Sequence, residues 1–205
     1  MRTIAWATIF LATLVWSAIA PSDSFTWFLE VLPALIGAGM LLATRRRFPL
    51  TPLLYGLILV HCLILMRGGH YTYAEEPFFN WLKEMFGWSR NNYDKLGHFA
   101  QGFIPAMVAR EILLRKAVVS GRGWLNFLVV CVCLAISAFY ELLEWWVAAL
   151  SGTAADAFLA TQGYVWDTQS DMAWALLGAI LALLMFAKIH DHQLAELQRP
   201  ARNEG

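Results

Sequence analysis

The segment LNFLVVCVCLAISAFYELLEWWVAAL, residues 125–150, decides the fold class of this chain. A helix that crosses a bilayer needs about 20 predominantly apolar residues at a rise of about 1.5 Å each, and this segment exceeds that length. Near its end it also carries two carboxylates, Glu141 and Glu144. A carboxylate at membrane depth is unfavourable unless it is paired, hydrated or bound to a metal, so such residues are candidates for a functional site. The segment therefore predicts a membrane helix that contributes to a polar site.

The rest of the chain has the same apolar character. Of its 205 residues, 59% are hydrophobic and 15% are charged, which is too apolar for a soluble globular protein. The formal net charge is zero, so charge gives no support for nucleic acid as a partner. We predict an all-α, polytopic membrane helical bundle that forms a single integral membrane domain over residues 1–205. Its transmembrane helices, about six, are expected at Ile4–Ala20, Trp27–Thr44, Pro52–Met66, Gly97–Leu114, Leu125–Leu150 and Asp171–Ala187.

The distribution of Lys and Arg predicts the orientation of these spans, because positively charged loops remain on the cytoplasmic side. Three basic clusters would lie on one side of the membrane, at residues 45–47, 115–122 and 188–205. The loops at residues 21–26 and 151–170 contain no Lys or Arg. Both termini are therefore predicted to be cytoplasmic (N-in and C-in), with residues 188–205 as a cytoplasmic tail.

The first span also has features of a signal peptide. A basic residue follows Met1, an apolar core comes next, and Ala18-Ile19-Ala20 fits an A-x-A cleavage site. We predict a retained helix instead, because the basic region is short and small residues are common in membrane bundles. Cleavage would leave five spans and the same orientation of the C-terminus.

The long outer loop, residues 67–95, contains a predicted amphipathic helix. Phe78, Leu82, Met85 and Phe86 fall on one helical face, and Pro77 is a favourable first residue for a helix. This pattern is typical of a helix that lies in the membrane interface. Such a helix would serve as a membrane anchor or as a lid over a pocket.

Polar residues gather near the outer ends of the last spans. Asp94 and His98, and likewise Asp167 and Asp171, are four residues apart and so share a helical face. We predict that His98, Glu141 and Asp171 form a catalytic group in one pocket of the outer leaflet. Its rim is predicted to contain Asp94, Asp167, Gln101 and, from the third span, His61. The alternative interpretation of Asp94 is a helix N-cap, because Asp is a favoured residue at that position.

The chemistry of this pocket leaves several interpretations open. Mixed His and carboxylate ligands suit Zn, Mn or Fe, so a divalent metal fits a set formed by His98, Glu141, Glu144 and Asp171. The sequence does not identify a cofactor. A His–Asp pair would equally serve as a general base and its orienting partner in hydrolysis. The remaining alternative is a hydrogen-bonded network that only holds helices together.

Four stretches of the chain resemble the YjdF family of bacterial inner membrane proteins. They are residues 68–75 (GGHYTYAE), 90–102 (RNNYDKLGHFAQG), 140–146 (YELLEWW) and 161–171 (TQGYVWDTQSD), within a likeness that spans about residues 5–195. The resemblance implies a multi-pass protein of the bacterial plasma (inner) membrane, and implies no defined activity. The family is known chiefly as a domain of unknown function.

A more distant resemblance is to VanZ-like membrane proteins. Their Asp-Lys-x-x-His-Phe pattern is similar to residues 94–99, and their later Glu and Asp are similar to Glu141 and Asp171. This resemblance implies that His98, Glu141 and Asp171 share one site. Residues 161–168 lack the Arg that usually precedes the last Asp of that pattern. If this Arg handles an anion in VanZ-like proteins, the resemblance does not extend that role to this chain.

Three functions follow from these observations. The first is a membrane-embedded enzyme that acts on a lipid or cell-envelope precursor at the outer leaflet. The second is a transporter or flippase that uses the polar cluster to bind a substrate or a proton. The third is a non-catalytic structural membrane protein. The chain has no convincing internal repeat, which disfavours transport. Membrane lipid is the expected partner, and the sequence does not indicate an oligomeric state.

Overall fold

The computed structural model describes residues 2–152 and 156–197, and their regular secondary structure is entirely helical. The all-α prediction is therefore confirmed. The elements are α1 (Arg2–Ala18), α2 (Ser24–Thr44), α3 (Pro52–Tyr71), the 3-10 turn η1 (Tyr73–Glu75), α4 (Pro77–Phe86), α5 (Tyr93–Arg115), α6 (Arg122–Ser151), α7 (Asp156–Leu159) and α8 (Asp167–Leu197).

Four of these helices, α2, α3, α6 and α8, are long and apolar enough to cross a membrane. Helix α1 is apolar but shorter. Helix α5 is long enough, but charged residues at both of its ends, among them Asp94, Lys95, Arg110 and Glu111, lower its hydropathy. The predicted count of six spans is thus supported for four helices, and the other two remain a prediction.

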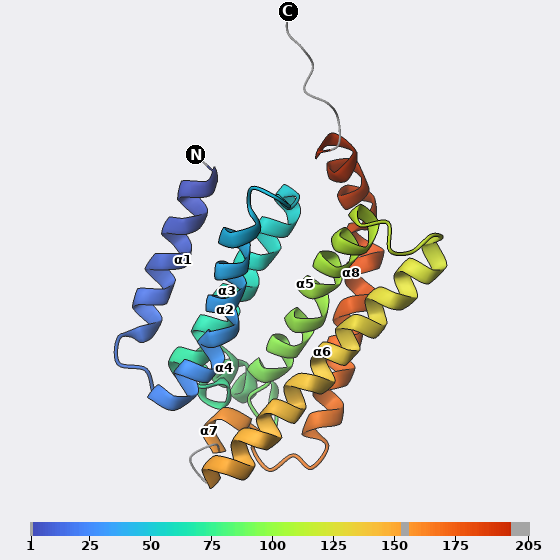
Figure 1. Cartoon of the computed structure of the whole chain (residues 1–205). Coiled ribbons are helices and arrows are strands. Elements are labelled where there is room, and N and C mark those ends of the chain that lie inside the picture. Colours follow the sequence, from blue (N-terminus) through green and yellow to red (C-terminus); the bar gives the residue numbers. More distant parts are fainter. Residues whose placement is uncertain (1, 153–155, 198–205) are drawn as a thin grey trace, which may run out of the picture.

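The long helices run in alternating directions (Figure 1). Helices α1, α2 and α3 form one side of the bundle, and α5, α6 and α8 form the other. The short helices α4 and α7 both lie at one end, which we call the α4/α7 end. Helix α1 begins and α8 ends at the opposite end. The α4/α7 end therefore collects the first turns of α2, α5 and α8 and the last turns of α6.

Helix α5 lies in the centre because it packs very closely on α8. A Cβ atom at Gly102 of α5 would overlap the backbone carbonyl of Ala175, and one at Gly178 of α8 would overlap that of Phe99. Small residues let membrane helices approach this closely, so that packing replaces the hydrophobic effect as the stabilising force. A polar helix is thereby shielded by its neighbours rather than by lipid.

Several helix boundaries differ from the prediction. Helix α3 continues to Tyr71 rather than ending at Met66, and α8 continues to Leu197, so most of the predicted tail is helical. The amphipathic helix forms as predicted, with Pro77 in its first turn and Gly87 in the left-handed conformation at its C-cap. Its N-cap is Glu76, whose side chain accepts a hydrogen bond from the backbone N–H of Phe79 at 2.7 Å. That α4 lies in the membrane interface remains a prediction.

Candidate functional site

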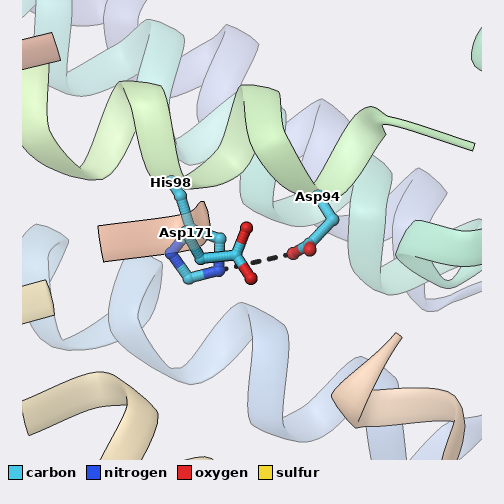
Figure 2. Close-up of side chains that lie close together, drawn as sticks. All are labelled: Asp94, His98 and Asp171. Carbon is cyan, nitrogen blue, oxygen red and sulfur yellow. Dashed lines mark ion pairs between the residues drawn. The ribbon is translucent and has the colours of Figure 1, made fainter. Parts of the chain in front are cut away.

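A group of three buried side chains lies at the α4/α7 end, where α5 and α8 begin (Figure 2). Asp94 and His98 stand one turn apart on α5, and Asp171 comes from the first turns of α8. Each offers one ligand atom, and these atoms lie within 4.8 Å of one another. All three residues are at least 95% buried. The group combines an imidazole with two carboxylates, a ligand set that suits Zn, Mn or Fe.

The ring of His98 faces oxygen atoms on both sides. Its Nε2 lies 3.4 Å from Oδ1 of Asp94, and its Nδ1 lies 3.2 Å from Oε1 of Gln101. An amide oxygen only accepts hydrogen bonds, so this contact fits the tautomer of His98 in which the N–H at Nδ1 donates a hydrogen bond to Gln101. The lone pair of a neutral ring then lies on Nε2, directed at the carboxylates. Metal-binding histidines are commonly held in this way by a partner of the second nitrogen.

Glu141 approaches the same ring from α6. Its Oε1 is 3.8 Å from Nδ1 of His98, and the residue is 8% exposed. This distance is within the range of an ion pair but too long for a hydrogen bond. The structure thus brings His98, Glu141 and Asp171 together from α5, α6 and α8.

Arg90 holds the outer edge of this cluster. It lies in the segment between α4 and α5, is 7% exposed, and forms ion pairs with Asp167 and, at 3.4 Å, with Oδ2 of Asp94. It also donates a hydrogen bond to the carbonyl oxygen of Ala160 at 3.2 Å. One guanidinium therefore serves two carboxylates, and Oδ1 of Asp94 is left to face His98.

The cluster contains more buried acid than base. Four carboxylates (Asp94, Glu141, Asp167 and Asp171) surround one guanidinium and one imidazole. Within residues 2–152 and 156–197, the buried oxygens Oε1 of Glu141 and Oδ1 of Asp171 accept no hydrogen bond. Buried acceptors of this kind are rare, and each needs an explanation such as a bound ion. The imbalance points to a site that takes up a cation.

The other predicted site residues are less closely involved. Glu144 and His61 are half-buried, and neither forms a hydrogen bond or an ion pair with the cluster in the described part of the chain. Asp94 is not the helix N-cap, because α5 begins one residue earlier and Asn92 occupies the cap position. This correction leaves the Asp94 carboxylate free to contact Arg90 and His98.

Two buried residues at this end were missed by the sequence analysis as members of the site. Arg90 is one of them. Its four-residue spacing from Asp94 could have indicated that these two side chains form an ion pair. Glu30 of α2 is the other, and it is 3% exposed. Tyr73 of η1 is also buried, and burial together with the nearby Glu30 carboxylate raises the pKa of Tyr73 well above its usual value. The Tyr73 hydroxyl therefore stays protonated at neutral pH.

A second polar cluster lies at the opposite end of α5 and α8. Both oxygens of Glu111 accept hydrogen bonds, one from the Thr51 hydroxyl at 2.8 Å and one from Arg115 at 2.7 Å. His190 lies 2.9 Å from Glu111 through Nε2 and 2.7 Å from Arg110 through Nδ1. Unlike Glu141 and Asp171, the carboxylate here is fully partnered. The sequence analysis did not predict this cluster, although a charged pair at residues 110–111 inside a predicted span could have indicated it.

Comparisons with known proteins agree with this membrane architecture. The model of a family described as "Predicted membrane protein (DUF2238)" matches residues 2–192. The chain is 56% identical over 181 residues to "Inner membrane protein YjdF" of Escherichia coli (strain K12), which covers 88% of this chain and 87% of that protein. No solved structure matches the chain. With its long apolar helices, the chain is thus a multi-pass protein of the bacterial inner membrane. The VanZ-like resemblance remains a prediction.

Proposed function

The chain belongs to the DUF2238 family of predicted membrane proteins, and we propose that it is a metal-binding inner-membrane enzyme. In this proposal, Asp94, His98 and Asp171 bind a divalent metal, and the site acts on a lipid or cell-envelope precursor in the outer leaflet. The observation that carries the proposal is the group of three ligand atoms within 4.8 Å, beside buried carboxylate oxygens that accept no hydrogen bond from the described residues.

The proposal includes six membrane crossings with both termini in the cytoplasm. Six long helices that alternate in direction, α1 and α5 included, support this count (Figure 1). The basic cluster at residues 45–47 and the basic segment at 115–122 lie between helices that meet at the end opposite α4 and α7. By the positive-inside rule that end is cytoplasmic, so the candidate site opens toward the outer leaflet.

The dimensions of the group suit a small divalent ion after a minor adjustment. Bonds of about 2.1 Å in a tetrahedral site place ligand atoms about 3.4 Å apart. His98 Nε2 and Asp94 Oδ1 already have this separation, and a pair at the 4.8 Å limit of the group would have to approach by about 1.4 Å. Arg90 fixes the second oxygen of Asp94, and Gln101 fixes the tautomer of His98. These partners would orient the ligands as second-shell residues do in known metal sites.

The surrounding residues suggest a division of roles. A metal of this kind lowers the pKa of bound water and polarises an ester or phosphoryl oxygen. Glu141 lies close to His98 and has an oxygen without a partner, so it would accept the proton of an attacking water as a general base. Glu144, one turn along the same helix, lies nearer to the outer surface and is a candidate for carrying that proton away.

The contrast between the two polar clusters favours a function over a purely structural role. A cluster that only joins helices is expected to satisfy its own acceptors, as Glu111 does at the opposite end. Charges that remain unsatisfied in the ground state are instead typical of sites that bind something. The cluster around His98 belongs to the second kind.

Metal analysis of the purified protein tests the proposal. We expect about one divalent metal ion per chain in wild type after exposure to Zn²⁺ or Mn²⁺ and removal of excess ion, and loss of that ion in His98→Ala and Asp171→Asn. His192→Ala is the matched control, because this histidine lies on α8 but its side chain is 74% exposed. Equal metal content in wild type and His98→Ala, or none in wild type, would contradict the proposal.

A further inference from the structure

A groove with aromatic walls opens at the α4/α7 end, beside the candidate metal site. It has a volume of about 600 Å³ and is predominantly apolar. Its lining comes from α4, the following segment, α5 and α8, chiefly through Phe79, Trp88, Lys95, Leu96, Phe99 and Trp174. Asp94 and His98 point from a different face of α5, so the groove is separate from the metal-binding group.

One residue of this lining carries a positive charge that forms no ion pair within the described part of the chain. Lys95 is half-buried, and its ammonium donates a hydrogen bond to the Ser170 hydroxyl at 2.6 Å and lies 5.1 Å from the centre of the Tyr164 ring. Among the residues that the structure describes, no carboxylate lies within 4.0 Å of this ammonium. Arg90, by contrast, is paired with two carboxylates. Lys95 therefore offers its positive charge to a ligand.

The groove is graded from polar to apolar along α5. Lys95 lies in the first turn of the helix, and Phe99 follows one turn deeper, where its ring meets Trp174 of α8 at a centroid distance of 6.5 Å. Trp88, which lines the groove, is exposed, and so is Trp81 of the neighbouring helix α4. Exposed Trp side chains are typical of the headgroup level of a bilayer. With the bundle oriented as proposed, the charge of Lys95 would lie at headgroup depth, and Phe99 and Trp174 would lie at acyl-chain depth.

We propose that this groove binds one anionic glycerophospholipid of the outer leaflet, with the phosphate on Lys95 and an acyl chain packed against the surface that Phe99 and Trp174 form together. The inference rests on the proposed function only for the orientation of the bundle. A lipid held in this way has its headgroup beside Asp94 and Asp171, the chain neighbours of Lys95 and Ser170. It would therefore deepen the proposed function by placing a phospholipid within reach of the metal-binding group.

Photocrosslinking in bilayers of defined composition tests this assignment. The protein is reconstituted in nanodiscs of phosphatidylcholine containing a trace of phosphatidylglycerol or phosphatidylcholine with a diazirine in the acyl chain. Crosslinked residues are then mapped by peptide mass spectrometry. We expect labels on the stretch that includes Leu96 and Phe99 and on that around Trp174, with phosphatidylglycerol labelled about fivefold more than phosphatidylcholine. This ratio corresponds to the about 1 kcal/mol that one Lys contributes near an anionic lipid.

Two variants and a control complete the experiment. Lys95→Gln should reduce phosphatidylglycerol labelling to the phosphatidylcholine level, whereas Lys83→Gln, which lies on α4 outside the groove lining, should leave the ratio unchanged. Trp174→Ala should reduce labelling by both lipids. Retention of phosphatidylglycerol in native mass spectrometry, measured on the same folded samples, provides an independent measure for each variant.

The proposal is overturned if labels spread evenly over the lipid-facing helices, or if the two lipids label the groove equally in wild type. The same measurements in His98→Ala and in the presence of a chelator separate it from the proposed function. Groove labelling that is unchanged by His98→Ala or by the chelator shows that the lipid site is independent of the metal. Groove labelling in a wild type that itself binds no metal would leave the lipid site standing and reject the metal. Metal binding without groove labelling would reject the lipid site alone.

Discussion

Replacement of Glu141 by Gln distinguishes a functional pocket from a structural ion-pair network. If Glu141 and His98 are joined as a stabilising ion pair, the charges at 3.8 Å attract by about 4 kcal/mol at an effective dielectric constant of about 20. Loss of that attraction would lower the melting temperature by about 8–16 °C, since 1 kcal/mol corresponds to about 2–4 °C for a protein of this size. This is the result that a structural network predicts.

We expect a different result, because Glu141 also lies among three other carboxylates and has an oxygen without a partner. The amide of Gln keeps the shape of the side chain and removes like-charge repulsion, so these gains offset the lost attraction. Glu141→Gln should therefore melt within about 4 °C of wild type, or above it, while activity falls. Active-site charges are often held at some cost in stability.

The matched control is Glu111→Gln in the fully partnered cluster at the opposite end. There, Arg115 and His190 both depend on the carboxylate, and loss of one partner from a buried network typically destabilises by about 3–5 kcal/mol. Thermal unfolding of both variants in the same detergent, followed by a fluorescence probe or by circular dichroism, gives the comparison. A loss of stability in Glu141→Gln as large as that in Glu111→Gln would refute the functional interpretation.

Three further predictions concern topology, packing and pH. A reporter that is active only in the cytoplasm should give signal when fused after Lys188 and none after Gly152; the reverse pattern would contradict the orientation. Gly102→Ala should lower the melting temperature, because its new methyl group meets the α8 backbone and overpacking costs about 1–3 kcal/mol, whereas Gly39→Ala, with open space around it, should have little effect. The side chain of Asp23 caps α2, and this hydrogen bond lowers its pKa. Wild type should therefore exceed Asp23→Ala in stability by about 1 kcal/mol above pH 4, and the difference should shrink as the pH falls through the lowered pKa; a difference that does not change with pH on the acid side would contradict a charged cap.

Much of the fold follows from local sequence patterns. Apolar runs long enough to span a bilayer predict the long helices, because lipid requires every backbone hydrogen bond to be made within the helix. The convergence of His98, Glu141 and Asp171 was predictable as well, since all three were expected at the same depth on successive spans. The group of three close side chains differs from the metal-binding set predicted from the sequence, which was His98, Glu141, Glu144 and Asp171. Asp94 belongs to the group, whereas Glu141 and Glu144 do not, and Glu141 approaches His98 only at 3.8 Å.

The features that could not be predicted depend on contacts between distant segments. Arg90 comes from a loop, where a basic residue is ordinarily exposed, and only the fold places it between Asp94 and Asp167. Glu111 and His190 belong to segments that were treated as a span and a tail, and they meet because α8 continues beyond the predicted boundary. Local periodicity carries no information about such long-range partners.

The close crossing of α5 and α8 has a mechanical consequence. Gly102 and Gly178 interlock the two backbones midway between the polar clusters, whose side chains join the same two helices near both ends. Sliding one helix past the other by a single turn, about 5.4 Å, would break both clusters and drive backbone into backbone. We therefore expect α5 and α8 to move together as one rigid unit. Any opening that admits a large substrate would then require α6, the α4 segment or helices α1–α3 to move relative to this pair.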